Sequence, residues 1–317
     1  MPLQAGLNRA GSSQRQKLNV VMEKLMKTLT PIAAALVFAL SGTALAAGNT
    51  ATQTQAGIGN SATATQSGPL TINNSIDQQQ SGFFNNANAT QSVQFGSSIL
   101  QVQNGAGNSA SSLQTFGANN SAMSMQTGIG NSSSTAQSVQ LGSSIVHTQS
   151  GFGNHASTMQ TAGFGNTSTI DQSGGFNHAY VNQFLSFGSN ASVTQNGLGN
   201  HAKANQSGVA QNTTIGQQGA FNSATTTQLY GLNNDADIMQ SGIANDADVI
   251  QGGFNNSVMG VQTGVANHLN VSQNGVGNLA TSTQAGLLNH LYISQTGFNE
   301  VAVAAQTGIG NHGVISQ

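Results

Sequence analysis

The chain has 317 residues, of which only 4 % are charged, and its formal net charge at pH 7 is −2. It contains no cysteine, which excludes a disulfide framework and cysteine-ligated zinc. Five of its six basic residues precede residue 28, so the rest of the chain has no positive patch for phosphates, and we predict no nucleic-acid binding.

Residues 1–47 are predicted to be an N-terminal extension followed by a secretory signal peptide. Lys24 and Lys27 form a short positive region, and residues 32–40 form an apolar run. That run is too short to cross a bilayer comfortably, which disfavours the alternative of a membrane anchor and predicts no stable membrane insertion. Residues 48–317 are then the secreted repeat domain. The expected cleavage region is marked by Ala44, Ala46 and Ala47.

Glutamine recurs through residues 48–317 at steps of 11 or 12, with one step of 14 between Gln66 and Gln80. Two steps form a unit of about 23 residues, and periods of this length are typical of solenoids. The polar composition would also be compatible with a disordered chain, but a disordered chain does not require a fixed register.

Each step contains an asparagine, five further residues and the glutamine, and these residues alternate as a β-strand does. In Asn60-Ser-Ala-Thr-Ala-Thr-Gln66 the two amides share a face with the alanines, so that face is expected inside. About four turn residues, including a glycine, follow each glutamine. The predicted fold is all-β: a flat parallel β-solenoid with two strands per coil and about 12 coils.

Stacked coils would place like amides above one another. Each primary amide has two donors and an acceptor, so it can bond both upward and downward in a continuous ladder. The ladder site that asparagine usually occupies is serine at Ser97, Ser143 and Ser189, and it is Gln211 and Glu300 elsewhere. The clearest members of the predicted ladder are Asn60, Gln66, Asn108, Gln114, Asn154, Gln160, Asn200, Gln206, Asn267, Gln273, Asn278, Gln284, Asn289, Gln295, Gln306 and Gln317.

The glycine after each glutamine is expected to permit the positive φ or the close approach that a tight corner needs. These predicted turn glycines include Gly57, Gly197, Gly264, Gly275, Gly286 and Gly308.

The repeat starts at Asn49 and the last ladder residue is Gln317, with no cap sequence visible at either end. Monomeric solenoids hide their terminal coils beneath polar caps. An uncapped stack presents unpaired strand edges, and such edges accept further strands. We therefore expect the chain to polymerise head-to-tail with copies of itself into cross-β amyloid fibres.

The frame Q-x-G-x-x-N-x-A-x-x-x-Q, present at 55–66 and 195–206, resembles the curlin repeat of bacterial curli fibre subunits. The resemblance covers essentially all of residues 49–317. It implies an extracellular functional amyloid at the bacterial cell surface, with roles in biofilm matrix, surface adhesion and cell aggregation. By the same resemblance, the expected partners are a curli-type nucleator and an outer-membrane secretion pore.

Six histidines follow an asparagine on even-numbered strands and share one outward site. They could bind a metal or sense pH. We favour the alternative of a solvated row copied by duplication, because metal sites need convergent ligands, and we predict no metal and no cofactor. The six are His155, His178, His201, His268, His290 and His312.

Asp235 and Asp237 are expected to face outward on one strand, and Asp246 and Asp248 on the next, with Asp246 one layer from His268. Paired carboxylates can be catalytic, but charges that slow premature stacking are the interpretation we favour. The chain has no G-x-S-x-G motif and only one lysine after residue 47, so we predict no enzyme.

The alternative function is a monomeric secreted β-solenoid that acts as an adhesin or ligand-binding module. Large apolar residues near the corners could plug the ends of the flat core, or they could mediate lateral contacts between fibres. They are Ile58, Ile129, Phe152, Phe164, Leu198 and Ile309.

Overall fold

The computed structural model describes residues 48–317, which form 24 β-strands and no helix. The predicted signal peptide lies outside these residues. In the described part of the chain, nothing forms an apolar helix of the length that a bilayer requires.

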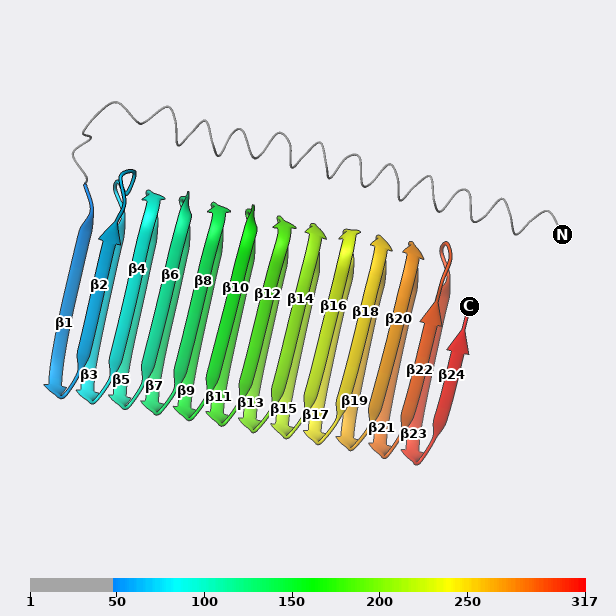
Figure 1. The fold of residues 1–317 in the computed structure, drawn as a ribbon. Helices are drawn as coiled ribbons and strands as arrows, with labels where there is room; N and C mark the ends of the chain where they lie inside the picture. The colour runs from blue at the N-terminus through cyan, green and yellow to red at the C-terminus, as the bar shows by residue number, and fades with distance from the viewer. Residues whose placement is uncertain (1–47) are drawn as a thin grey trace. The chain divides into compact units, whose positions relative to one another are not determined.

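Each coil contributes one strand to each of two 12-stranded sheets, and neighbouring strands within a sheet are parallel because the chain returns one full coil later (Figure 1). We number the coils 1 to 12, each an odd-numbered strand followed by an even-numbered one. The odd-numbered sheet contains β1 (Thr50–Ile58), β3 (Ser75–Phe83), β5 (Ser98–Ala106), β7 (Ser121–Ile129), β9 (Ser144–Phe152), β11 (Thr167–Gly175), β13 (Asn190–Leu198), β15 (Asn212–Ala220), β17 (Asp235–Ile243), β19 (Ser257–Val265), β21 (Leu279–Leu287) and β23 (Val301–Ile309). The even-numbered sheet contains β2 (Ser61–Ser67), β4 (Asn86–Phe95), β6 (Ser109–Ala118), β8 (Ser132–Leu141), β10 (His155–Phe164), β12 (His178–Phe187), β14 (His201–Val209), β16 (Ser223–Leu232), β18 (Asp246–Phe254), β20 (His268–Val276), β22 (His290–Gln295) and β24 (His312–Ser316).

The predicted solenoid of about 12 coils is confirmed, and the ladder glutamines stay in register along both sheets, although the even-numbered sheet has register shifts after the glutamines of β12, β14 and β16. Gln55 pairs with Gln80 in the odd-numbered sheet, and Gln273 pairs with Gln295 in the even-numbered sheet. The long step between Gln66 and Gln80 is absorbed in the connection between β2 and β3, which contains Pro69. The register survives because the extra residues leave the sheets, where proline could not join a central ladder.

The strands differ from the prediction at their ends. They run past the glutamine and through the following glycine, so β1 includes both Gln55 and Gly57, and the turn to β2 has two residues instead of about four. Its first residue, Gly59, has a φ of 70°. Coil 2 places Phe84 there, with a φ of 53°. A left-handed residue is required at this point because the chain must reverse within two residues.

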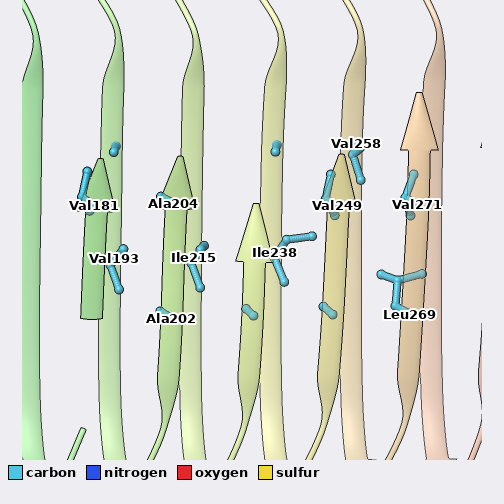
Figure 2. Close-up of a cluster of buried hydrophobic side chains, with 14 of the residues drawn as sticks. Val181, Val193, Ala202, Ala204, Ile215, Ile238, Val249, Val258, Leu269 and Val271 are labelled. Atoms are coloured by element: carbon cyan, nitrogen blue, oxygen red, sulfur yellow. The ribbon is translucent and has the colours of Figure 1, made fainter. Parts of the chain in front are cut away.

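The flat interior contains two apolar clusters separated by a polar layer. The larger cluster packs aliphatic residues of one coil on those of the next, as in the row Val193, Ile215 and Ile238 (Figure 2). The smaller cluster contains Ile76 and Ile99 in the first coils. Between the clusters the interior row is occupied by Ser124, Thr135, His147 and Thr158, all buried.

The corner residues do not plug the core. Ile58 is 64 % exposed and Ile309 is 74 % exposed, and Phe152 is also exposed. Of the two sequence-based interpretations, the plug is therefore wrong, whereas lateral contacts between fibres stay a prediction.

Candidate assembly site: the amide ladders

The ladder glutamines lie on the inner face of both sheets, one on each strand except β24, which Gln317 directly follows, as predicted. Each Nε2 donates to the Oε1 of the glutamine one coil further along. In the odd-numbered sheet, where the ladder runs from Gln55 to Gln306, these bonds measure 2.7–2.9 Å. In the even-numbered sheet, where the ladder runs from Gln66 to Gln317, the bonds measure 2.7–3.1 Å. The second N–H of each Nε2 group donates to a backbone carbonyl of the opposite sheet. Gln262 Nε2, for example, donates to Asp246 O at 2.8 Å.

The asparagine ladders run in the opposite direction. The backbone N and the Nδ2 of Asn131 donate backward to the Oδ1 of Asn108 at 3.0 and 3.1 Å, and Nδ2 also donates forward to Gly151 O at 3.1 Å. Each amide therefore links three successive coils. The residue before every even-numbered strand is asparagine, from Asn60 to Asn311.

The ladder before the odd-numbered strands is interrupted by Ser97, Ser143, Ser189 and Gln211, and two glutamines that the sequence analysis missed hydrogen-bond the first two of these serines. Gln94 directs its Oε1 at the backbone N–H groups of residues 115, 116 and 117, at 3.1–3.2 Å, while its Nε2 donates to Ser97 Oγ at 2.8 Å. The reverse orientation would set an NH₂ group against three donors. Gln140 has the same arrangement two coils later, with Ser143 at 2.9 Å. Their signal was present in the sequence as a glutamine three residues before the serine.

The glycines after the ladder glutamines lie within strands and not at turns, which corrects the prediction, although their expected close approach is confirmed. Gly264 has a φ of 122°, and an added Cβ would overlap the carbonyl oxygen of Gly286 in the next coil. That carbonyl accepts the Nδ2 of Asn267 at 3.1 Å. The missing side chain therefore lets the ladder asparagine reach the neighbouring coil. Gly57, Gly197, Gly286 and Gly308 also have positive φ, whereas Gly275 shares the close approach without it.

His147 occupies the polar interior layer and is fully buried. Its Nδ1 lies 2.9 Å from Ser133 Oγ and its Nε2 lies 2.8 Å from Thr158 Oγ1. Burial, with a smaller contribution from the charge of His155, lowers the pKa of His147 from 6.5 to about 3. The alternation with the inward Gln149 was the sequence signal for this burial.

We expect acid to destabilise the coils around His147. Its folded-state pKa lies below its unfolded value, so the stabilisation is complete above pH 6.5 and is lost as the pH falls toward 3, by about 1.4 kcal/mol per pH unit. His147→Gln, which copies the buried Gln101 of coil 3, should remove this contribution to the dependence of the unfolding free energy on pH. Urea unfolding followed by circular dichroism at several pH values measures it. The control is His312→Gln on the outer face, and an equal loss of slope in both variants would contradict the assignment.

The outward histidines share one register position of the even-numbered sheet, as predicted, but Ser223 and Asp246 occupy that position on β16 and β18 and divide the histidines into two rows. His155, His178 and His201 stack on β10, β12 and β14, and the remaining three, His268, His290 and His312, stack on β20, β22 and β24. The first two rings of each row have centroids 5.7 and 5.6 Å apart. Burial, followed by the charge of His178, lowers the pKa of His155 and of His201. Within residues 48–317 no three histidine, aspartate or glutamate side chains converge as a metal-ligand set.

The four aspartates surround coil 9, with Asp235 and Asp237 on the outer face of β17 and Asp246 and Asp248 on that of β18. Asp246 Oδ2 lies 3.0 Å from Nδ1 of His268, which confirms their predicted proximity. Partial burial, followed by the charge of Asp235, raises the pKa of Asp237. Burial and then Asp246 raise that of Asp248, while His268 opposes the shift. On each outer face of coil 9, the two carboxylates therefore repel each other.

A family model described as the curlin associated repeat matches residues 212–242 and 264–297. The matches fall on β15 to β17 and on β20 to β22, where the glutamine ladder continues from coil to coil, as from Gln217 to Gln240 and from Gln273 to Gln295. The search among curated proteins found no match. Proteins of this family are structural rather than enzymatic. The chain therefore contains the curlin associated repeat, matched on coils of the solenoid.

Proposed function

We propose that the protein is the structural subunit of curli-like extracellular amyloid fibres, which self-assemble at the bacterial cell surface for biofilm matrix, adhesion and cell aggregation. The observation that carries the proposal is that the two ends of the described stack are complementary. At the coil 1 end, the Oε1 of Gln55 accepts no bond from any described residue, whereas Gln80 Oε1 accepts from Gln55 at 2.8 Å. At the coil 12 end, Gln306 Nε2 donates only to His290 O, at 2.9 Å.

The asparagine ladder gives the same complementarity with the opposite direction. Asn311 donates backward to Asn289 Oδ1, and its own Oδ1 accepts nothing within residues 48–317. At the other end, the N–H of Asn60 faces outward in the position from which Asn85 N donates to Asn60 Oδ1 at 3.0 Å. One copy stacked on another would therefore continue every ladder, and leaving a buried amide unpaired costs about 1–3 kcal/mol.

Extracellular surface fibres are the known form of curlin-family proteins, which supports secretion of this chain. The proposal thus includes cleavage near Ala47, export through a curli-type outer-membrane pore and nucleation by a curli-type partner. The monomeric adhesin remains the competing function.

Incubation of the purified protein distinguishes the two functions. Fibre formation predicts a rise in thioflavin fluorescence, filaments by electron microscopy and a reflection at about 4.8 Å along the filament axis. Protein that stays monomeric through weeks of incubation with preformed aggregates would favour the adhesin and overturn the fibre proposal.

Replacement of the four coil 9 aspartates by asparagine should speed fibre formation. Asn removes the negative charges from both outer faces of coil 9, and like charges on neighbouring stacks oppose contact between such faces. We expect the lag time to shorten by about twofold or more. Asp77→Asn, outside coil 9, is the control. An unchanged lag in the fourfold variant would contradict a role of these charges in slowing assembly.

A further inference from the structure

Backbone bonds between coils hold together the ladder that precedes the odd-numbered strands. At each step, the backbone N–H of a ladder residue donates to the side-chain oxygen of the ladder residue one coil earlier, at 2.8–3.1 Å. Serine accepts as asparagine does, since Asn120 N donates to Ser97 Oγ at 3.1 Å. Gln211 N likewise donates to Ser189 Oγ at 3.1 Å, so the bonds continue as far as coil 8.

The step from Gln211 to Asn234 is missing within residues 48–317. Gln211 is buried, but neither its Oε1 nor its Nε2 has a partner, and no described residue accepts the backbone N–H of Asn234. Asn234 Nδ2 keeps only its forward bond, to Gly253 O at 3.1 Å. Glutamine is one methylene longer than asparagine, and Gln211 Nε2 lies 2.9 Å from the point that a Cβ of Gly208 would occupy. The amide is therefore directed at the strand end of coil 7 and does not reach Asn234.

Other irregularities gather beside this step. Ser186 and Ser207 are buried, and their hydroxyl groups have no partner among the described residues. The strand β14 is one residue shorter here than β12, because the interval from Gln183 to Ser186 pairs with the interval from Gln206 to Gly208. The register shifts of the described sheets all fall between β12 and β18. Unpaired buried groups cost free energy, so this part of the edge is held more weakly than the rest.

The interior of the same coils is continuous. Gln206 Nε2 donates to Gln228 Oε1 at 3.1 Å, and Gln228 Nε2 donates to Gln251 Oε1 at 2.9 Å. Ile215 and Ile238 also pack on each other within the larger apolar cluster (Figure 2). The weakness is therefore confined to the turns at one edge of the solenoid.

Two successive turns on this edge differ in how many bonds tie them to the coil before. In both, the left-handed turn residue donates backward, from Asn233 N to Val209 O at 3.0 Å and from Asn255 N to Leu232 O at 2.8 Å. The second turn adds two bonds, from the backbone N and Nδ2 of Asn256 to the preceding ladder residue at 3.0 and 3.2 Å. The turn at 233–234 has neither of these two bonds.

We propose that the turn at 233–234 is a point of local opening built into the solenoid, where the edge between coils 8 and 9 separates while the interior stays packed. Segments with few backbone bonds open locally at a lower free energy than the packed core. The side chain of Gln211 controls this opening, because its length withholds the acceptor that Asn234 N would use. The inference concerns the folded chain itself and does not depend on fibre formation.

Hydrogen exchange of the freshly purified full chain, measured by mass spectrometry on its peptides, tests the inference. We expect the amides of 233–234 to exchange about tenfold faster than those of 255–256, a ratio that corresponds to the loss of about one hydrogen bond. Equal exchange at the two turns would overturn the proposal.

Three variants test the role of Gln211. Gln211→Asn supplies the residue that coils 9 to 11 have at this site, and it should slow exchange at 233–234 about tenfold. Asn256→Gln makes the reverse change one step later, and it should speed exchange at 277–278, because Asn278 N now donates to Asn256 Oδ1 at 3.1 Å. The matched control is Gln218→Asn on the outer face of β15, which should change neither turn.

The variants can also contradict the proposal. Unchanged exchange at 233–234 in Gln211→Asn would reject the control of opening by this side chain, and so would unchanged exchange at 277–278 in Asn256→Gln. Slower exchange spread evenly over all the coils of Gln211→Asn would indicate a change in global stability and would overturn local opening. Slowing at 233–234 in Gln218→Asn would show that the effect is not specific to the ladder site.

Discussion

Replacing Gly264 with alanine is expected to destabilise the solenoid strongly, as at the other in-strand glycines of the same row. Gly264 lies in β19 with a φ of 122°, and its Cβ would overlap the backbone carbonyl of Gly286, which cannot move without breaking the bond from Asn267 Nδ2. Backbone strain and overpacking therefore add to the loss of a ladder contact. We expect the free energy of unfolding to fall by about 4 kcal/mol or more. Urea unfolding followed by circular dichroism measures it.

Gly188→Ala is the matched control. Gly188 has a φ of 62°, and nothing lies within 4 Å of an added Cβ. The turn between coils 7 and 8 already has alanine at the equivalent position, where Ala210 has a φ of 51°. The cost of this variant should be about 1 kcal/mol, because only the left-handed backbone penalty applies. Similar losses in both variants would show that steric contact between coils is not what requires glycine at position 264.

The Gln262→Ala variant is expected to show the second-largest effect. Gln262 is fully buried, accepts from Gln240 Nε2 at 2.8 Å, and donates to Gln284 Oε1 at 2.9 Å and to Asp246 O at 2.8 Å. Alanine would leave both buried carbonyl oxygens without this donor and would open a cavity. We expect the free energy of unfolding to fall by about 3 kcal/mol. Fibre elongation should slow in parallel, since fewer monomers are folded in register.

Ser272→Ala on the neighbouring β20 is the control for this prediction. Its side chain faces outward, so its loss should change the stability by less than about 0.5 kcal/mol. Equal effects of the two substitutions on unfolding and on elongation would mean that the amide ladder does not carry the register.

Much of the fold followed from the amino-acid sequence alone. The recurrence of glutamine predicted the two-strand coil, because a fixed period returns the same residue to the same place. Alternation within Asn60–Gln66 predicted the inner face, since successive side chains in a strand point to opposite sides. The same reasoning placed the six histidines at one outward position of the even-numbered sheet and Asp246 beside His268, and the structure confirms both. These properties depend only on local periodicity.

Only the tertiary structure decided how neighbouring coils contact each other. The opposite directions of the glutamine and asparagine ladders depend on the orientation of each amide, which no period specifies. The glycine row proved to lie within strands because the close approach of Gly264 to Gly286 exists only between coils. Gln94 contacts the backbone one coil later, and Gln211 has no partner at either side-chain atom although coils lie on both sides of it. Contacts between residues that are 22 or 23 positions apart depend on how the layers are spaced. The sequence of a single layer does not specify this spacing.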